Sequence, residues 1–257
     1  MKYYVASDIH GFFSPFRDAL TEAGYFDDPE PHKLILLGDL FDRGREAVKL
    51  QEFILDLMGR DQVILIRGNH EDLFEQFVTV DEGLPYQLHR DNGTYSTALQ
   101  LTGYDMAMAV ARNHDFAEAA MKTPYYQRIM PAMIDYYETR SFVFVHGWIP
   151  TIFERGRDYC YIEKWRECDK QAWAEARWIN GMMASKTSYE EKTVVCGHWH
   201  ASFGHARFER SGPEFGVGAD FTPYYGAGII AIDACTSVSG FVNVIVLKDT
   251  PMEDLHD

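Results

Sequence analysis

The stretch LLGDLFDRGREAV (residues 36–48) begins with apolar residues and continues with charged ones. Asp39 and Asp42 lie three residues apart, and Arg43 follows directly. Like charges this close to an apolar segment are costly to bury unless something neutralises them. The stretch therefore predicts a buried strand that ends at a charged site, and it leaves open which group neutralises the two carboxylates.

The same order, an apolar strand followed by a polar loop with His, Asp or Asn, recurs along the chain. The segments are YYVASDIHG (3–11), KLILLGDLFDRG (33–44), QVILIRGNHED (62–72), SFVFVHGWIP (141–150) and KTVVCGHWHAS (192–202). Their strands are almost continuous runs of Val, Ile and Leu, which is typical of strands covered on both faces. Helical patterns over 14–24 and 45–59 separate the first three segments. This alternation predicts an α/β layered sheet whose loops gather at one edge.

Residues 72–140 break this order and are rich in helical patterns. Helices are predicted over 71–78, 96–103, 115–122 and 130–140. We interpret residues 72–140 as a helical insert within a single domain that spans residues 1–257, because the strand-and-loop order resumes after it. The segment 228–249 then predicts two further strands, which we expect to form a hairpin with a turn around Ser239 and Gly240.

The composition narrows the range of partners. The formal net charge is -15 at pH 7, which argues against a nucleic-acid partner held through phosphate contacts but not against metal cations. No apolar run is long enough to cross a bilayer, and the N-terminal MKYYVASDIHG reaches charged residues too early for a signal peptide. We therefore expect a cytoplasmic protein with no nucleic-acid partner and no membrane partner.

The polar loops together carry a mixed set of nitrogen and oxygen ligands. Its candidates are Asp8, His10, Asp39, Asn69, His70, His146, His198 and His200. Imidazoles, carboxylates and an amide oxygen suit Mn, Fe, Zn and similar divalent ions, whereas structural zinc sites favour thiolates. Alternate residues of an extended segment point the same way, so Asp8 and His10 are expected to hold one ion. His198 and His200 repeat this spacing. The set is too large for one ion, and Asp39 could bridge two.

These motifs, in this order, resemble those of the calcineurin-like metallophosphoesterases. The motifs are D-x-H from Asp8, G-D-x-x-D-R-G from Gly38, G-N-H-E from Gly68, H-G from His146 and G-H-x-H from Gly197. The forms GDLFDRG and GNHE are similar to those of the branch with the serine/threonine phosphoprotein phosphatases, their bacterial and phage relatives and the symmetrical diadenosine tetraphosphate hydrolases. The resemblance leaves out the helical insert. It implies a four-layer α/β/β/α sandwich and a two-metal phosphoester hydrolase.

The resemblance also implies a role for each residue. The first metal would be held by Asp8, His10 and Asp39, and the second by Asp39, Asn69, His146 and His198. A water between the ions would attack phosphorus in line, and Arg43, Asn69 and Arg177 would contact the phosphate. His70 would protonate the leaving oxygen, and Asp42 would orient His70 and keep it cationic. In the wider class the second histidine of the last motif binds the first metal, so His200 is a further candidate ligand.

Simpler interpretations stay open for the less specific positions. His200 could pack within its loop, and Asp42 could be a helix N-terminal residue favoured by the helix dipole. Arg177 could be a solvated helix residue stacked between two tryptophans, Trp173 and Trp178. Trp148 and Trp199 flank the expected site, where they could form a substrate wall or simply pack.

The preferred expectation is a metal-dependent phosphatase that acts on phosphoserine or phosphothreonine proteins. Mn is the expected metal, and Fe, Zn, Ni or Mg also fit the ligands. Two departures from the protein-phosphatase pattern weaken the protein-substrate expectation: the second histidine of GHWH (197–200) and the sequence HGWIP (146–150). The alternative is a symmetrical dinucleoside polyphosphate hydrolase or another small-molecule phosphoesterase, for which the aromatic insert could supply a base pocket. The unbroken ligand set disfavours a non-catalytic binding module.

Overall fold

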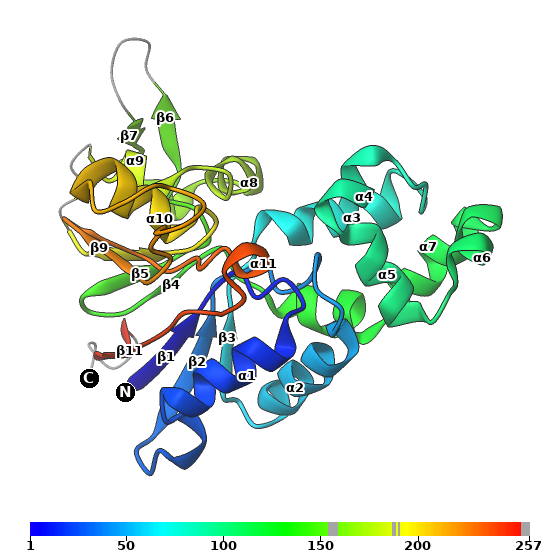
Figure 1. Cartoon of the computed structure of the whole chain (residues 1–257), viewed down its shortest axis with the longest axis horizontal. Coiled ribbons are helices and arrows are strands. Elements are labelled where there is room, and N and C mark those ends of the chain that lie inside the picture. The colour runs from blue at the N-terminus through cyan, green and yellow to red at the C-terminus, as the bar shows by residue number, and fades with distance from the viewer. Residues whose placement is uncertain (154–158, 187–188, 190, 253–257) are drawn as a thin grey trace.

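Two β-sheets lie at the centre of the protein in a computed structural model that describes residues 1–153, 159–186, 189 and 191–252 (Figure 1). The first sheet contains β1 (Lys2–Ala6), β2 (His32–Leu36), β3 (Val63–Leu65) and β11 (Val244–Lys248), in the order β11-β1-β2-β3. The second contains β4 (Tyr137–Glu138), β5 (Phe142–Phe144), β8 (Thr193–Cys196), β9 (Tyr224–Gly226) and β10 (Ile229–Ala231), in the order β4-β5-β8-β10-β9. A separate pair is formed by β6 (Thr151–Phe153) and β7 (Tyr159–Tyr161).

Helices connect and cover these strands. The α-helices are α1 (Phe13–Glu22), α2 (Ala47–Gly59), α3 (Asn69–Thr79), α4 (Gln87–Asn92), α5 (Thr94–Thr102), α6 (Met106–Ala111), α7 (Asn113–Met121), α8 (Lys170–Ala176), α9 (Gly181–Ala184), α10 (Ala201–Gly204) and α11 (Thr236–Ser239). Short 3₁₀ helices cover Tyr25–Asp27, Met130–Ala132 and Trp165–Glu167, and single π turns cover Tyr125–Ile129 and His205–Glu209. In the part of the chain that the structure describes, none of the helices has the length and apolar character needed to span a membrane.

The strands that precede the motifs run parallel within each sheet. In the first sheet Ala6 of β1 lies opposite Leu36 of β2, which in turn lies opposite Leu65 of β3. In the second sheet Val195 of β8 lies opposite Phe144 of β5. The carboxyl ends of parallel strands share one edge, so the loops that follow them gather there. This confirms the arrangement expected from the repeated strand-and-loop order.

Four layers result from the alternation of side chains along the strands. Tyr3 and Val5 of β1 are buried between the two sheets with residues of the second sheet such as Phe144. Tyr4 of β1 instead packs on the opposite face, in a core shared with Phe16 of α1. The outer face of the second sheet has its own buried core, which includes Trp148, Trp165 and Trp173. The predicted α/β/β/α sandwich is therefore confirmed.

The prediction of a helix over residues 130–140 is wrong. A 3₁₀ turn covers only Met130–Ala132, and β4 then pairs with β5, with Tyr137 opposite Phe144. The adjacent Tyr136 stacks on Trp173, with ring centroids 5.2 Å apart. Aromatic residues pack well on a half-buried sheet, and here this tertiary packing outweighs the local helical pattern.

The hairpin predicted over 228–249 is also wrong. Although both strands form, β10 pairs with β8 and β9 in the second sheet, whereas β11 pairs with β1 in the first. The short helix α11 lies between them. The segment from β10 to β11 therefore crosses from one sheet to the other, and it does so at the edge where the motif loops gather.

Helices α3 to α7 extend to one side of the sandwich (Figure 1). Their aromatic residues Tyr95 and Phe116, like Tyr125 of the following π turn, are buried in the core that also contains Phe16 of α1. These three rings are therefore occupied by packing and are not available to a base.

Candidate active site

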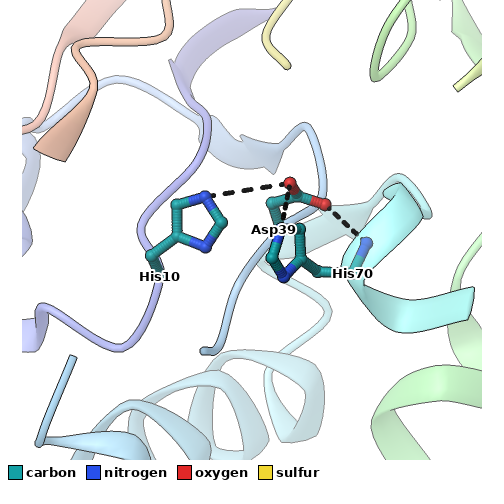
Figure 2. Close-up of side chains that lie close together, drawn as sticks. All are labelled: His10, Asp39 and His70. Carbon is teal, nitrogen blue, oxygen red and sulfur yellow. Dashed lines mark hydrogen bonds and ion pairs between the residues drawn. The ribbon is translucent and has the colours of Figure 1, made fainter. Parts of the chain in front are cut away.

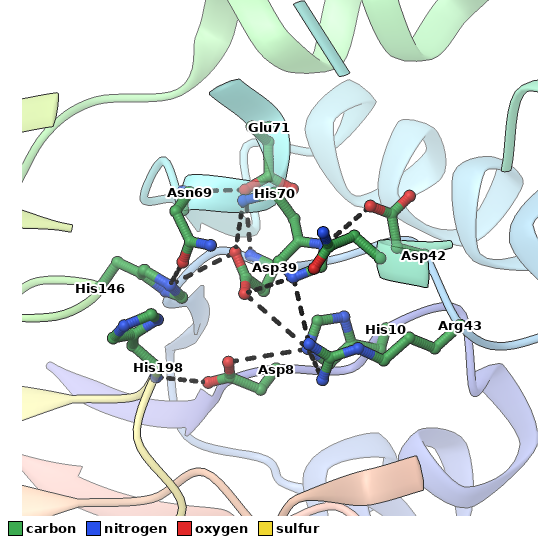
Figure 3. A network of polar contacts seen from close by, with 12 residues as sticks. Asp8, His10, Asp39, Asp42, Arg43, Asn69, His70, Glu71, His146 and His198 are labelled. Atoms are coloured by element: carbon green, nitrogen blue, oxygen red, sulfur yellow. Dashed lines mark hydrogen bonds and ion pairs between the residues drawn. The ribbon is translucent and has the colours of Figure 1, made fainter. Parts of the chain in front are cut away.

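Side chains from five motif loops point toward one another at the shared strand edge (Figure 3). They are Asp8 and His10 after β1, Asp39, Asp42 and Arg43 after β2, Asn69 and His70 at the start of α3, His146 after β5 and His198 after β8. Arg43 is exposed and His198 is partly exposed, whereas the others are buried. The fold thus brings together most of the residues that the sequence nominated.

Asp39 lies at the centre of this cluster. Its Oδ2 atom is 3.8 Å from Nε2 of His10 and 3.8 Å from Nε2 of His70. Figure 2 marks these two contacts with dashed lines. Its Oδ1 atom is 3.3 Å from Nε2 of His146. Two groups of ligand atoms, His10 with Asp39 and His70, and Asp39 with His146 and His198, each lie within 4.8 Å of one another. One carboxylate is therefore common to two candidate cation sites.

Backbone carbonyl groups fix the tautomers of two histidines. Nδ1 of His146 donates to the carbonyl oxygen of Leu37 at 2.6 Å, and Nδ1 of His10 donates to that of Phe41 at 3.0 Å. In each neutral ring Nε2 then offers a lone pair toward the cluster. Nε2 of His146 lies 2.8 Å from Oδ1 of Asn69 as well as near Asp39. This convergence of electron-pair donors is what a divalent cation requires, so the residues fit a metal site.

The protonation states also suit metal binding. Burial would raise the pKa of Asp39, but four histidines, His146 foremost, outweigh it and hold the pKa below its usual range. Burial, reinforced by His146, lowers the pKa of His198 to about 3. Burial together with Arg43 and His70 lowers the pKa of His10 well below its ordinary value. Neutral imidazoles and an ionised carboxylate are the forms that bind metal.

Asp8 lies beside a carboxylate that the sequence analysis did not consider, Asp233. Oδ1 of Asp8 is 4.0 Å from Nε2 of His10, and its Oδ2 accepts from the backbone N–H of His198 at 2.9 Å. Burial, Asp233 and Asp39 raise the pKa of Asp8 well above its ordinary value. Burial likewise raises the pKa of Asp233 to about 6. Buried carboxylates in such proximity call for a cation. Asp233 is the second residue after β10, the same signal that identified the other loops, but it lay inside the expected hairpin.

His70 is held by Asp42, whose carboxylate is in turn held by two threonines of α5. Nδ1 of His70 donates to Oδ2 of Asp42 at 2.7 Å. The hydroxyls of Thr94 and Thr97 donate to the two oxygens of the Asp42 carboxylate at 2.9 Å and 2.7 Å. Burial lowers the pKa of His70, but Asp39 and Asp42 outweigh it, so that the pKa is raised overall. Asp42 precedes α2 by several residues, so its interpretation as a helix N-terminal residue is wrong.

Arg43 faces the cluster from its exposed side. Its Nη1 atom is 3.0 Å from Nε2 of His10, and its Nη2 atom is 3.2 Å from Nε2 of His70. The guanidinium group therefore bridges the Nε2 atoms of the two rings (Figure 3). A planar, exposed cation in this position is suited to bind the oxygens of an incoming phosphate.

Glu71, the last residue of the GNHE motif, positions two loops and was given no role from the sequence. Its carboxylate accepts from the backbone N–H groups of Gly68, Asp39 and Leu40 at 2.8, 3.0 and 3.1 Å. A Cβ atom at Gly68 would overlap the carboxylates of Asp39 and Glu71, so this approach requires glycine. The buried Glu71 therefore holds the loops after β2 and β3 against each other.

Left-handed backbone conformations aim several of these side chains. The φ angles are 51° at Asp8, 50° at His10, 53° at Asp39, 76° at Asp42 and 64° at His198. Such angles cost free energy in non-glycine residues and persist only where the surroundings enforce them, which is common at functional sites. The extended geometry expected for D-x-H and H-x-H is therefore wrong, because tight turns, not alternation along a strand, direct these side chains.

Two nominated residues make other contacts. Nε2 of His200 is 2.7 Å from Oε1 of Glu214, and among the described residues His200 belongs to neither group of candidate ligand atoms. Arg177 is buried and forms ion pairs with Asp72 and Asp135. The interpretation of Arg177 as a solvated helix residue is therefore wrong, and its guanidinium is already neutralised by carboxylates.

The two tryptophans that flank the site differ in their surroundings. Trp148 is buried in the core outside the second sheet, which confirms that it packs. Trp199 keeps 36% of its surface exposed. A wall of the site can therefore involve Trp199 but not Trp148.

A sandwich of this kind, with clustered histidines and carboxylates at the carboxyl edge of its strands, is suited to bind divalent metal ions. The family model of the calcineurin-like phosphoesterases matches residues 1–217. The chain therefore belongs to the calcineurin-like phosphoesterase family.

Individual relatives match shorter parts of the chain. The asymmetrical bis(5'-nucleosyl)-tetraphosphatase PrpE of Bacillus mycoides is 33% identical over 96 residues, which cover 33% of this chain and 39% of that protein. The symmetrical bis(5'-nucleosyl)-tetraphosphatase of Buchnera aphidicola is 38% identical over 71 residues, covering 28% of this chain and 24% of that protein. These matches therefore span well under half of either relative.

Solved structures share the fold over almost the whole chain. A cold-active protein-tyrosine phosphatase of a psychrophilic Shewanella has a TM-score of 0.57 at 15% identity, covering 96% of this chain and 75% of that one. A candidate diadenosine tetraphosphatase has a TM-score of 0.50 at 14% identity, covering 96% and 89%. At such identities the likeness establishes the fold alone.

Proposed function

We propose that this protein is a two-metal phosphoester hydrolase whose ions share Asp39. The observation that carries the proposal is that this one buried carboxylate belongs to both groups of ligand atoms. Asp8, His10 and Asp39 would hold one ion, with Asp8 in place of the His70 of the first group because His70 is engaged by Asp42. Asp39, Asn69, His146 and His198 would hold the other. We keep manganese as the expected metal. When bound, two such ions supply an activated water and neutralise charge on the phosphoryl group.

The residues around the ions perform the remaining steps. Arg43 binds phosphate oxygens with its planar fork and orients the phosphorus toward the cluster. His70 carries a proton on Nε2 and transfers it to the leaving oxygen, while its Nδ1 proton stays bonded to Asp42. Asp42 thereby fixes the direction of the ring. Arg177 and His200 are left out of this assignment because carboxylates already engage them.

Dinucleoside polyphosphates are the substrate class that we place first, ahead of phosphoproteins. Two relatives with matching segments are named bis(5'-nucleosyl)-tetraphosphatases, one asymmetrical and one symmetrical. This reverses the order expected from the sequence motifs, which put phosphoserine and phosphothreonine proteins first. Both classes require the same cluster, so the assignment of the metal site does not depend on this choice.

A substrate panel tests the assignment. The manganese-loaded protein would be given diadenosine tetraphosphate, a phosphothreonine peptide and an aryl phosphodiester under identical conditions, and the substrates would be ranked by kcat/KM. We expect the dinucleotide to rank first. If the peptide ranks first, the substrate class is wrong although the phosphoesterase assignment stands. If none of the three is hydrolysed, the proposed site itself is wrong.

A further inference from the structure

An aromatic hollow lies beside the metal cluster. Its volume is about 570 Å³, and it is lined by residues that include Trp178, Asn180, Trp199, Phe203 and Arg207. Trp178 follows α8, whereas Trp199 comes from the loop after β8 and Arg207 from the π turn after α10. The hollow is large enough for a ring system of drug-like size.

The hollow is joined to the cluster through His198. The His198 ring meets Trp178 edge to face, with centroids 5.8 Å apart and planes at 84°. It meets Trp199 in the same manner, with centroids 6.1 Å apart and planes at 66°. His198 belongs to the group with Asp39 and His146, so a phosphoryl group held there would be next to the ring that both indoles contact. The hollow is therefore within reach of the same substrate molecule.

The lining has the chemistry of a site for a planar heterocycle. Trp178 and Trp199 are 52% and 36% exposed, although large aromatic side chains are usually buried. Among the described residues Arg207 has no ion-pair or hydrogen-bond partner, and it is exposed. Asn180 uses its side-chain oxygen to accept from the N–H of Met183, which leaves its amide donors for a ligand. Glu214, which also lines the hollow, is paired with His200.

We propose that this hollow binds one nucleobase of the substrate, stacked on Trp199 and Trp178. Arg207 is available to a phosphate further along the polyphosphate chain, and the amide of Asn180 to the edge of the base. This inference rests on the proposed function and names the residues that select for a nucleotide. Stacking on tryptophan accepts any base, because every base has a π face.

A matched pair of ligands tests the hollow by binding alone. Adenosine 5'-(α,β-methylene)diphosphate and methylenediphosphonate carry the same non-hydrolysable diphosphate group, and only the first carries a base. Calorimetric titration of the manganese-loaded protein is expected to show tighter binding of the nucleotide by about 5- to 150-fold. Trp199→Ala should bring this ratio close to one, and Trp199→Phe should retain part of it. Tyr86→Ala, which removes an exposed ring outside the hollow, should not change it.

The ratio of the two affinities distinguishes an effect on the hollow from an effect on the metal site, because damage to the metal site should weaken the binding of both ligands equally. A ratio near one in the unmodified protein would overturn the inference. So would a ratio that survives in the double variant Trp178→Ala/Trp199→Ala. Full nucleotide preference in a protein that does not hydrolyse diadenosine tetraphosphate would keep the hollow and remove the proposed substrate. If the protein hydrolyses the dinucleotide and the double variant has an unchanged kcat/KM, the proposed substrate is kept and the proposed role of the hollow is removed.

Discussion

Asp39 is the residue on which the site depends most directly. Its two oxygens face different histidines, and His70 also donates its backbone N–H to Oδ1 at 3.0 Å. We expect Asp39→Asn to lower the occupancy of both ions, because an amide replaces the shared negative charge. Elemental analysis after gel filtration measures this directly. Retention of two ions per chain would exclude the bridging position.

His70 is expected to act on the leaving group and not on metal binding. His70→Asn should lower turnover by roughly 10²–10⁴, the usual range for a general acid, while the metal content stays the same. The loss should be largest for substrates with poor leaving groups, which need protonation most. Equal losses for good and poor leaving groups would remove this role from His70.

Asp42 should control the pH range in which His70 can donate a proton. Asp39 and Asp42 raise the pKa of His70, so its protonated form persists to higher pH and is lost as pH rises through that raised value. Asp42→Asn removes one of these charges and should lower the pKa. The alkaline fall in kcat/KM should therefore begin at lower pH than in the unmodified protein. An alkaline limb that does not move would contradict the coupling.

At the scale of elements, helix α5 supports the site from outside the sheet. Thr97 both donates to the Asp42 carboxylate and accepts from the Asp42 backbone N–H at 2.9 Å. We expect Thr97→Val to lower turnover, because the carboxylate that orients His70 loses a partner while buried. Thr97→Ser, which restores the hydroxyl, should recover most of the activity. If the valine variant loses thermal stability but keeps its turnover and pH profile, Thr97 has only a structural role.

The sequence predicted the positions of strands and helices better than it predicted which strands pair with each other. Runs such as ILL before Asp39 indicated buried strands, and their order indicated the shared edge. Strand pairing at 228–249 was misjudged because two strands close in sequence usually form a hairpin, whereas here each completes a different sheet. Glu71 and Asp233 were missed as parts of the site. The role of Glu71 depends on contacts between distant segments, which local patterns do not encode, whereas Asp233 follows a buried strand but lay inside the expected hairpin.

The left-handed turns at the site were also not predictable from the sequence. Asp8 and His10 do lie in the cluster, but the wrong geometry was expected for them. Non-glycine residues rarely adopt positive φ angles, and nothing local indicates that these two do. His200 and Arg177 were nominated by spacing and by analogy, and the fold gives both of them carboxylate partners instead. Residue types were thus predictable, whereas directions required the tertiary structure.

For the whole molecule, metal binding should contribute to folding stability. Without cations, the buried carboxylates of Asp8, Asp39 and Asp233 repel one another. Manganese at 100 times its dissociation constant should add about 2.7 kcal/mol to the free energy of unfolding per site, and chelation should remove it. Thermal denaturation with and without EDTA measures the change as a shift in Tm. An unchanged Tm on chelation would contradict the ligand assignment. The Asp39→Asn variant is the control, and EDTA is expected to shift its Tm less than that of the unmodified protein.

The division of the cluster between the two sheets has a mechanical consequence. His10 and Asp39 come from loops of the first sheet, and His146 and His198 from loops of the second. Any sliding of one sheet over the other would change the separation of Asp39 from His146 but leave that of Asp39 from His10 unaltered. The geometry of the second ligand group therefore depends on how the two sheets are positioned relative to each other. An ion bound by this group would link the two sheets and oppose their sliding.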